Sequence, residues 1–261
     1  MIEKHIAEAT SMFPESRIVG VFLQGSQNYG LSTKDSDVDT KCILVPTFND
    51  IALNKKPIST THVLDNNEHL DLKDIRLYIE TFYKQNLNFL EILFTPYKYI
   101  NPLYKEEWQH LIDNREAIAH MNPVRAAKSM KGIAHEKFHA MEHPYPSKIE
   151  IIQKYGYDGK QVSHLLRVYD YLSRYIDGES YESCLRPSAH IRQRILDYKA
   201  QLIPLEEARE EASRYINWID ALEARFCSGK EAEEDAKTRW LLEDVCCRIM
   251  KISIKKEIGE F

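Results

Sequence analysis

The stretch FLQGSQNYGLSTKDSDVDTKCILVP, residues 22–46, decides the fold, because a polar loop in it joins two apolar segments. The overlapping segment RIVGVFL, residues 17–23, is β-branched and apolar, which predicts a buried strand. Residues 37–46 alternate and then become apolar up to a proline, which predicts a second strand. The loop between them is rich in turn-forming residues. It is either a surface hairpin with a polar rim or a site for phosphate and metal ions.

Gly25 and Ser26, at the end of the first predicted strand, have the properties of a phosphate-binding turn. A glycine lets a ligand approach the backbone closely, and the serine adds a hydroxyl donor. If a short helical turn begins at residue 27, its free N–H groups face the same place. We therefore predict that Gly25 and Ser26 bind a nucleotide phosphate.

Asp37 and Asp39 are two residues apart, a spacing that puts both side chains on one face of a strand. Neighbouring carboxylates repel each other unless a positive charge lies between them. Mg²⁺ prefers carboxylate and phosphate oxygens, so the pair predicts a metal site, with Mn²⁺ as a possible substitute.

Asp71 supplies a third carboxylate in the segment EHLDLKD, residues 68–74. It lies between Leu70 and Leu72, whose side chains point to the opposite, apolar face of a predicted strand. Two-metal transfer of a phosphoryl or nucleotidyl group needs such a residue to hold the second ion. Asp37, Asp39 and Asp71 are therefore the predicted catalytic and metal-binding residues.

The rest of the chain is mainly helical in pattern. The first 13 residues predict a helix, short strands are expected at 59–64 and 68–72, and a helix is expected from Asp74, a suitable N-cap. Further helices are predicted at 103–118, 122–142, 159–177, 188–201, 204–226 and 233–257. The prediction is an α+β protein, with a catalytic domain at residues 1–115 and a helical domain at 116–261 that closes the nucleotide and acceptor cleft.

Charge and cysteine content narrow the function. The 261 residues have a net charge of −5, yet residues 121–200 hold 13 basic and 9 acidic residues. This argues against broad duplex binding and permits a local site for an anionic ligand. The five cysteines form no C-x-x-C pattern, and no apolar run approaches the roughly 20 residues that span a bilayer. We expect reduced thiols and a cytoplasmic location.

Lys128, Lys131 and His135 follow one another at spacings of three and four, so they share one face of a helix with His139. They are candidates for binding the triphosphate or an anionic acceptor, and the alternative is a solvated basic face. A zinc site formed with His139 and His143 lacks both the H-E-x-x-H glutamate and a thiolate.

Lys160, His164 and Arg167 form a second basic stripe, at positions i, i+4 and i+7 of a predicted helix. An apolar face lies beside them, so we expect the helix to pack on a neighbour and to point these side chains towards the nucleotide. The alternative is an ordinary amphipathic helix.

The order of these motifs resembles the DNA polymerase β-like nucleotidyltransferase superfamily, whose signature is G-S, about ten residues, D-x-D, and a separated aspartate. Gly25, Ser26, Asp37, Asp39 and Asp71 match it in order. The chain also resembles the "predicted nucleotidyltransferase" group of bacteria and phages across residues 18–175, through GSQNYGLSTKDSDVDTK, NLNFLEILF and GYDGKQVSHLLRVYDYL. The usual N-P-N of that group is N-L-N here.

The resemblance implies a minimal nucleotidyltransferase fold, a short mixed sheet flanked by helices. It implies transfer of a nucleoside monophosphate from a nucleoside triphosphate, with Mg²⁺ and release of pyrophosphate. Asp37 and Asp39 would bind both metals, and Asp71 the one that activates the acceptor. The acceptor stays open between a small hydroxyl compound, an RNA end and a protein.

Two other functions are weighed against this one. The first is a nucleotide-binding regulator or antitoxin-like partner that keeps the fold without turnover; the presence of all three carboxylates argues against it. The second is a metal-dependent phosphohydrolase, and the chain has no His-Asp dipeptide of the kind expected in that class.

Overall fold

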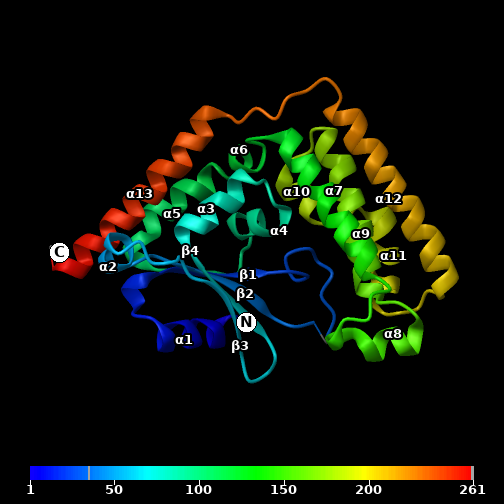
Figure 1. The fold of residues 1–261 in the computed structure, drawn as a ribbon, viewed down its shortest axis with the longest axis horizontal. Helices are drawn as coiled ribbons and strands as arrows, with labels where there is room; N and C mark the ends of the chain where they lie inside the picture. Colours follow the sequence, from blue (N-terminus) through cyan, green and yellow to red (C-terminus); the bar gives the residue numbers. More distant parts are fainter. Residues whose placement is uncertain (35, 260–261) are drawn as a thin grey trace. The chain divides into compact units, whose positions relative to one another are not determined.

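The computed structural model describes residues 1–34 and 36–259 (Figure 1). The chain forms two compact units: unit 1 is Met1–Asn122 together with Glu234–Phe261, and unit 2 is Pro123–Glu233. This division differs from the predicted domains, because the last helix, α13 (Ala236–Ile258), packs on α3 and α5 of unit 1. None of the described helices is long and apolar enough to span a membrane.

Unit 1 is built on a five-stranded mixed sheet in the order β3-β4-β2-β1-β5. Its strands are β1 (Ile18–Gln24), β2 (Asp39–Leu44), β3 (Ser59–Val63), β4 (His69–Asp74) and β5 (Lys98–Ile100). The β2–β4 pair is parallel and the other pairs are antiparallel. Four strands confirm the sequence prediction, whereas the three-residue β5 is too short to leave a periodic signal.

Helices flank both faces of this sheet. The helices of unit 1 are α1 (Glu3–Met12), α2 (Phe48–Ala52), α3 (Ile75–Tyr83), α4 (Leu87–Leu90), α5 (Lys105–Asp113), α6 (Arg115–Ala119) and α13, with short 3-10 turns at Glu15–Arg17, Glu91–Leu93 and Pro102–Tyr104. Asp74 caps α3 as predicted, since its side chain accepts a hydrogen bond from the backbone N–H of Arg76 at 2.9 Å. The predicted α+β class is confirmed.

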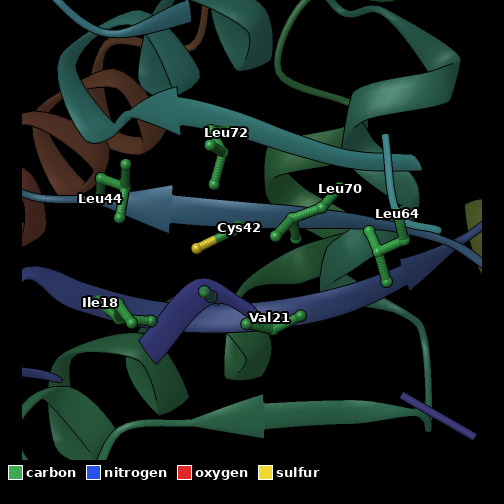
Figure 2. Close-up of a cluster of buried hydrophobic side chains, with 8 residues drawn as sticks. Ile18, Val21, Cys42, Leu44, Leu64, Leu70 and Leu72 are labelled. Atoms are coloured by element: carbon green, nitrogen blue, oxygen red, sulfur yellow. The ribbon is translucent and has the colours of Figure 1, made fainter. Parts of the chain in front are cut away.

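The face of the sheet next to α1 forms an apolar core (Figure 2). Cys42 and Leu44 of β2 and Leu70 and Leu72 of β4 point into it, each almost fully buried. Because strand residues alternate between faces, the residues between them point to the other face, towards α4. The same two strands therefore build an apolar core on one side and carry the polar residues Asp39, Lys41 and Asp71 on the other.

Unit 2 is helical. It contains α7 (Pro123–Ala140), α8 (Ile149–Tyr155), α9 (Gly159–Ile176), α10 (Tyr181–Leu185), α11 (Ala189–Lys199) and α12 (Leu205–Cys227), and a 3-10 turn at Pro146–Lys148. The helices α7, α10, α11 and α12 all pack on α9, whose apolar face is the centre of the unit. The four long helices were predicted; α8 and α10 are one or two turns long and lie in segments that contain glycine or proline breaks.

Candidate active site

The turn after β1 leaves room for a ligand at Gly25. Its φ of +94° is a conformation that favours glycine, and a Cβ built there has no atom within 4 Å. Ser26 follows directly, partly exposed, and its carbonyl accepts a hydrogen bond from Leu31 N–H at 2.9 Å. The segment is a hydrogen-bonded turn. The helical turn from residue 27, which the sequence allowed, does not form. The space beside the Gly25 backbone is open to a ligand.

Side chains on both sides hold this turn in place. Asn28 is buried, donates from Nδ2 to the carbonyl of Leu23 at 3.0 Å, and accepts at Oδ1 from the Thr95 hydroxyl at 2.7 Å. Since Thr95 is also buried, the turn is fixed before any ligand arrives, which lowers the entropy cost of binding. Sequence reasoning missed both residues, because asparagine is common in turns for local reasons.

Glu91 is a buried carboxylate behind the turn. It is 2% exposed, and its Oε1 accepts a hydrogen bond from the backbone N–H of Gly25 at 3.3 Å. In the sequence, Glu91 is visible only as a single acid in the apolar run NFLEILF, which by itself indicates no role. A buried acid needs such partners, so Glu91 positions the Gly25 backbone from the inside of the protein.

Asp39 is the first residue of β2 and lies opposite Gln24, the last residue of β1. The Gly25 turn therefore begins one residue from the register position of this carboxylate. Asp39 Oδ1 accepts from the backbone N–H of His69 at 3.0 Å and lies 3.0 Å from the His69 ring Nδ1. The Asp39 side chain is partly exposed to solvent.

Asp71 lies in β4 and is paired with Lys41 across the parallel β2–β4 ladder. Paired residues of a ladder share a face, and Lys41 shares a face with Asp39 two residues earlier, so both aspartates are on the same face of the sheet. Asp71 Oδ2 is 3.4 Å from the ammonium of Lys41, and Oδ1 accepts from the Thr61 hydroxyl at 3.4 Å.

Asp37 lies outside the sheet. The predicted strand at residues 37–46 begins only at Asp39, so strand alternation does not fix the direction of the Asp37 side chain. The strand starts late in part because the backbone of Asp37 is bound to the turn. The side-chain amide of Gln27, in the turn, donates to the carbonyl of Asp37 at 3.0 Å. Asp37 is exposed, beside the same turn as Ser26.

Two lysines of the polar face contact one aromatic ring. The ammonium groups of Lys41 and Lys73 lie 4.3 Å and 4.7 Å from the centre of the Phe89 ring, which α4 supplies. Burial lowers the pKa of Lys41, an effect that Asp71 and then Glu91 oppose. Sequence reasoning missed this group, because it depends on the pairing of β2 with β4.

Carboxylate oxygens on one face of the sheet are the donor set that Mg²⁺ takes, and the Lys41 ammonium shows that a positive charge is accommodated beside Asp71. In residues 1–34 and 36–259, however, no three His, Cys, Asp or Glu side chains converge as a ready metal site. The chemistry of Asp39 and Asp71 fits a divalent ion, which would share them with His69 and Lys41. The same finding gives the suggested zinc site at His135 no support.

Two residues of the first basic stripe form ion pairs with acids of unit 2. Lys131 lies 3.3 Å from Asp220 and 3.1 Å from Glu223 on α12, and His135 Nε2 lies 2.8 Å from Asp220. Lys128 is exposed on the same helix. A phosphate at this stripe would compete with two carboxylates, which disfavours nucleotide binding there.

The second stripe, Lys160, His164 and Arg167, lies on α9 of unit 2 as predicted for its helical position. The turn at Gly25 and Ser26 and the three aspartates all belong to unit 1. The structure thus brings the Gly25 turn together with Asp39 and Asp71 in one compact unit.

A short mixed sheet with a glycine turn after one strand and aspartates at the start of the next defines the DNA polymerase β-like nucleotidyltransferase class. The chain belongs to RlaP, the RNA repair pathway DNA polymerase beta family, whose model matches residues 2–239. This confirms the resemblance to the superfamily and indicates nucleotidyltransferase-type activity. A search of curated proteins finds no match.

Proposed function

We propose that the protein is a Mg²⁺-dependent nucleotidyltransferase that moves a nucleoside monophosphate from a nucleoside triphosphate to an acceptor hydroxyl, with release of pyrophosphate. The observation that carries the proposal is the register of β1 and β2, which puts Asp39 beside the Gly25 turn. Family membership supports the reaction class.

In this proposal the Gly25 turn binds the β- and γ-phosphates. The open backbone at Gly25 admits a phosphate oxygen, and Ser26 donates from its hydroxyl. Glu91, Asn28 and Thr95 keep the turn in its binding conformation through the hydrogen bonds described above. The triphosphate is thereby oriented with its α-phosphate on the side of Asp39.

Asp37, Asp39 and Asp71 would hold the metal ions, which supply charge neutralisation of the phosphate oxygens and a lower pKa for the attacking hydroxyl. Asp71, two residues further along the β2–β4 ladder than Asp39, would orient the acceptor hydroxyl and accept its proton. Lys41 keeps the Asp71 carboxylate in place on the face of the sheet.

Of the three acceptor classes that the sequence leaves open, we propose an RNA end. The support is the description of the family, which names an RNA repair pathway. The net charge of −5 implies that such an RNA is bound at a local basic surface and not by the whole molecule.

The test is transfer of label from each α-labelled nucleoside triphosphate, with Mg²⁺ or Mn²⁺, to separated RNA, protein and small-molecule fractions of a cell extract. Asp39→Ala and Asp71→Ala should abolish transfer. Asp65→Ala, which removes an exposed carboxylate from the β3–β4 turn, is the matched control and should transfer normally. Transfer that survives loss of either aspartate would refute the proposal.

The same assay separates the rival function. Binding of ATP by calorimetry, without pyrophosphate release in the presence of any acceptor fraction, would support a nucleotide-binding regulator. The ion pair between Asp71 and Lys41 is the observation that keeps this candidate in the test.

A further inference from the structure

Three helices of unit 2 meet at the first turn of α9. The backbone N–H of Asp158, its N-cap, donates to the carbonyl of Met141, just past the end of α7, at 2.7 Å. The N–H of Gly159 donates to the side chain of Gln201, just past the end of α11. A Cβ at Gly159 would collide with the carbonyl of Tyr198, so only glycine permits this approach.

Basic residues gather at this junction. Lys160, His164 and Arg167 occupy successive turns of α9 on one face. Lys137 lies in the last turn of α7, and Lys199 is the last residue of α11. The sequence predicted the stripe on α9 but not the two lysines, because they join it only through the packing of the helices.

The charges of Lys137, Lys160, Arg167 and Lys199 all act on the fifth residue, His164. Burial of the His164 ring, followed by the charges of Arg167 and the lysines Lys160, Lys137 and Lys199, holds the pKa of His164 well below its usual range. The imidazole is therefore neutral at pH 7 and has one N–H to donate. Arg167 is only 3% exposed, so its charge acts in a medium of low dielectric constant.

Two acids lie on the same helices as these cations. Asp158 accepts from the backbone N–H of Lys160 at 2.9 Å and also pairs with Lys148 at 3.7 Å. Glu136 pairs with Lys137 at 2.7 Å, but its side chain is 67% exposed, and such surface pairs are weak.

The other basic stripe of unit 2 offers a contrast. There Lys131 and His135 face two carboxylates of α12 within 3.3 Å. At the α9 junction the groups that act most strongly on the histidine are all cations. Cations from three helices that converge on a neutral donor form an arrangement that an anion stabilises.

We propose that unit 2 binds a phosphate group at the junction of α7, α9 and α11, through Lys137, Lys160, His164, Arg167 and Lys199. The phosphate belongs either to a nucleoside triphosphate or to an RNA strand. The inference does not depend on nucleotidyl transfer, because binding is measurable without turnover.

The experiment is calorimetric titration of the full chain, in EDTA, with ATP and separately with a 5′-phosphorylated ten-nucleotide RNA. The double variant Lys160→Gln/Lys199→Gln should raise the Kd of at least one of them by tenfold or more. Lys128→Gln is the control, since it removes one exposed lysine of α7 about 13 Å along the helix from Lys137; its Kd should stay within twofold. Thermal unfolding should be unchanged in both variants.

A loss seen with RNA alone identifies an RNA phosphate, and a loss seen with ATP identifies the triphosphate; both support the site. The proposal is overturned if neither ligand binds, if the double variant binds both normally, or if Lys128→Gln weakens binding equally. Asp39→Ala should keep the RNA affinity while it loses transfer, so failure of this inference and failure of the proposed function give different results.

Discussion

The two faces of β2 and β4 differ in almost every property, although they are made by alternate residues of the same strands. Towards α1 lie Cys42, Leu70 and Leu72, packed without any exposed surface. Towards α4 lie Asp39, Lys41 and Asp71, which are joined by register and by an ion pair. Neighbouring residues, about 3.3 Å apart along the strand, thus serve different functions: one packs the core and the next carries a polar group of the candidate site.

The comparison shows that adjacent residues of one strand can serve stability and catalysis separately, because their side chains point to opposite faces. A substitution on the α1 face should lower stability and leave the folded molecules active. A substitution on the α4 face should lower activity and leave the molecule folded. The four predictions below test this separation, from the largest expected effect to the smallest.

Asp39→Asn should reduce nucleotidyl transfer by about a thousandfold, equal to about 4 kcal/mol, because charge stabilisation by metal ions supplies several kcal/mol. The midpoint of thermal unfolding should change little, since the side chain is partly exposed. Transfer kinetics and calorimetric unfolding measure the two effects. A large loss of stability with normal transfer would break the comparison.

Leu72→Ala should lower the free energy of unfolding by about 3 kcal/mol, the usual cost of a cavity in a core. Transfer per folded molecule should remain near normal. Denaturant unfolding gives the first value, and active-site titration gives the second. Val63→Ala, on the exposed edge strand β3, is the control and should cost far less.

Lys41→Met should reduce transfer by about tenfold, about 1.4 kcal/mol, because Asp71 loses the ammonium that orients it. Methionine keeps the apolar stem on the Phe89 ring, so packing is preserved. Lys73 contacts the same ring, but the ion pair to Asp71 comes from Lys41. Lys73→Met should therefore have a smaller effect. Equal effects of the two variants would show that Lys41 acts only through its charge.

Cys42 should resist iodoacetamide at pH 8.5 in the native protein. Burial raises its thiol pKa to about 12, so the reactive thiolate is nearly absent, and the α1 face also excludes the reagent. Exposed Cys247 should be alkylated first. Mass spectrometry of the peptides measures both rates; in the Leu72→Ala variant the labelling of Cys42 should accelerate, because the core opens more often.

The sequence predicted the strands and the faces of Asp39 and Asp71, because both follow from local alternation of apolar and polar residues. It could not predict that β4 joins β2 in parallel, since this pairing involves residues 30 positions apart. The roles of Lys41 and Phe89 depend on that pairing and were missed for the same reason.

Glu91 and α13 show a second limit. A buried acid in an apolar run has no periodic signature, and only the approach of Gly25 gives it a role. The helix at 236–258 was predicted correctly, but its amphipathic pattern does not say which unit it covers. Tertiary contacts decide both.

The return of α13 to unit 1 makes unit 2 an insertion, with its two connections held together where the N–H of Asp235 donates to the carbonyl of Met121 at 2.9 Å. During synthesis, residues 1–122 and then the whole of unit 2 are translated before the last helix of unit 1. The sheet that carries the aspartates is therefore made first and receives its last covering helix only after unit 2 has been made.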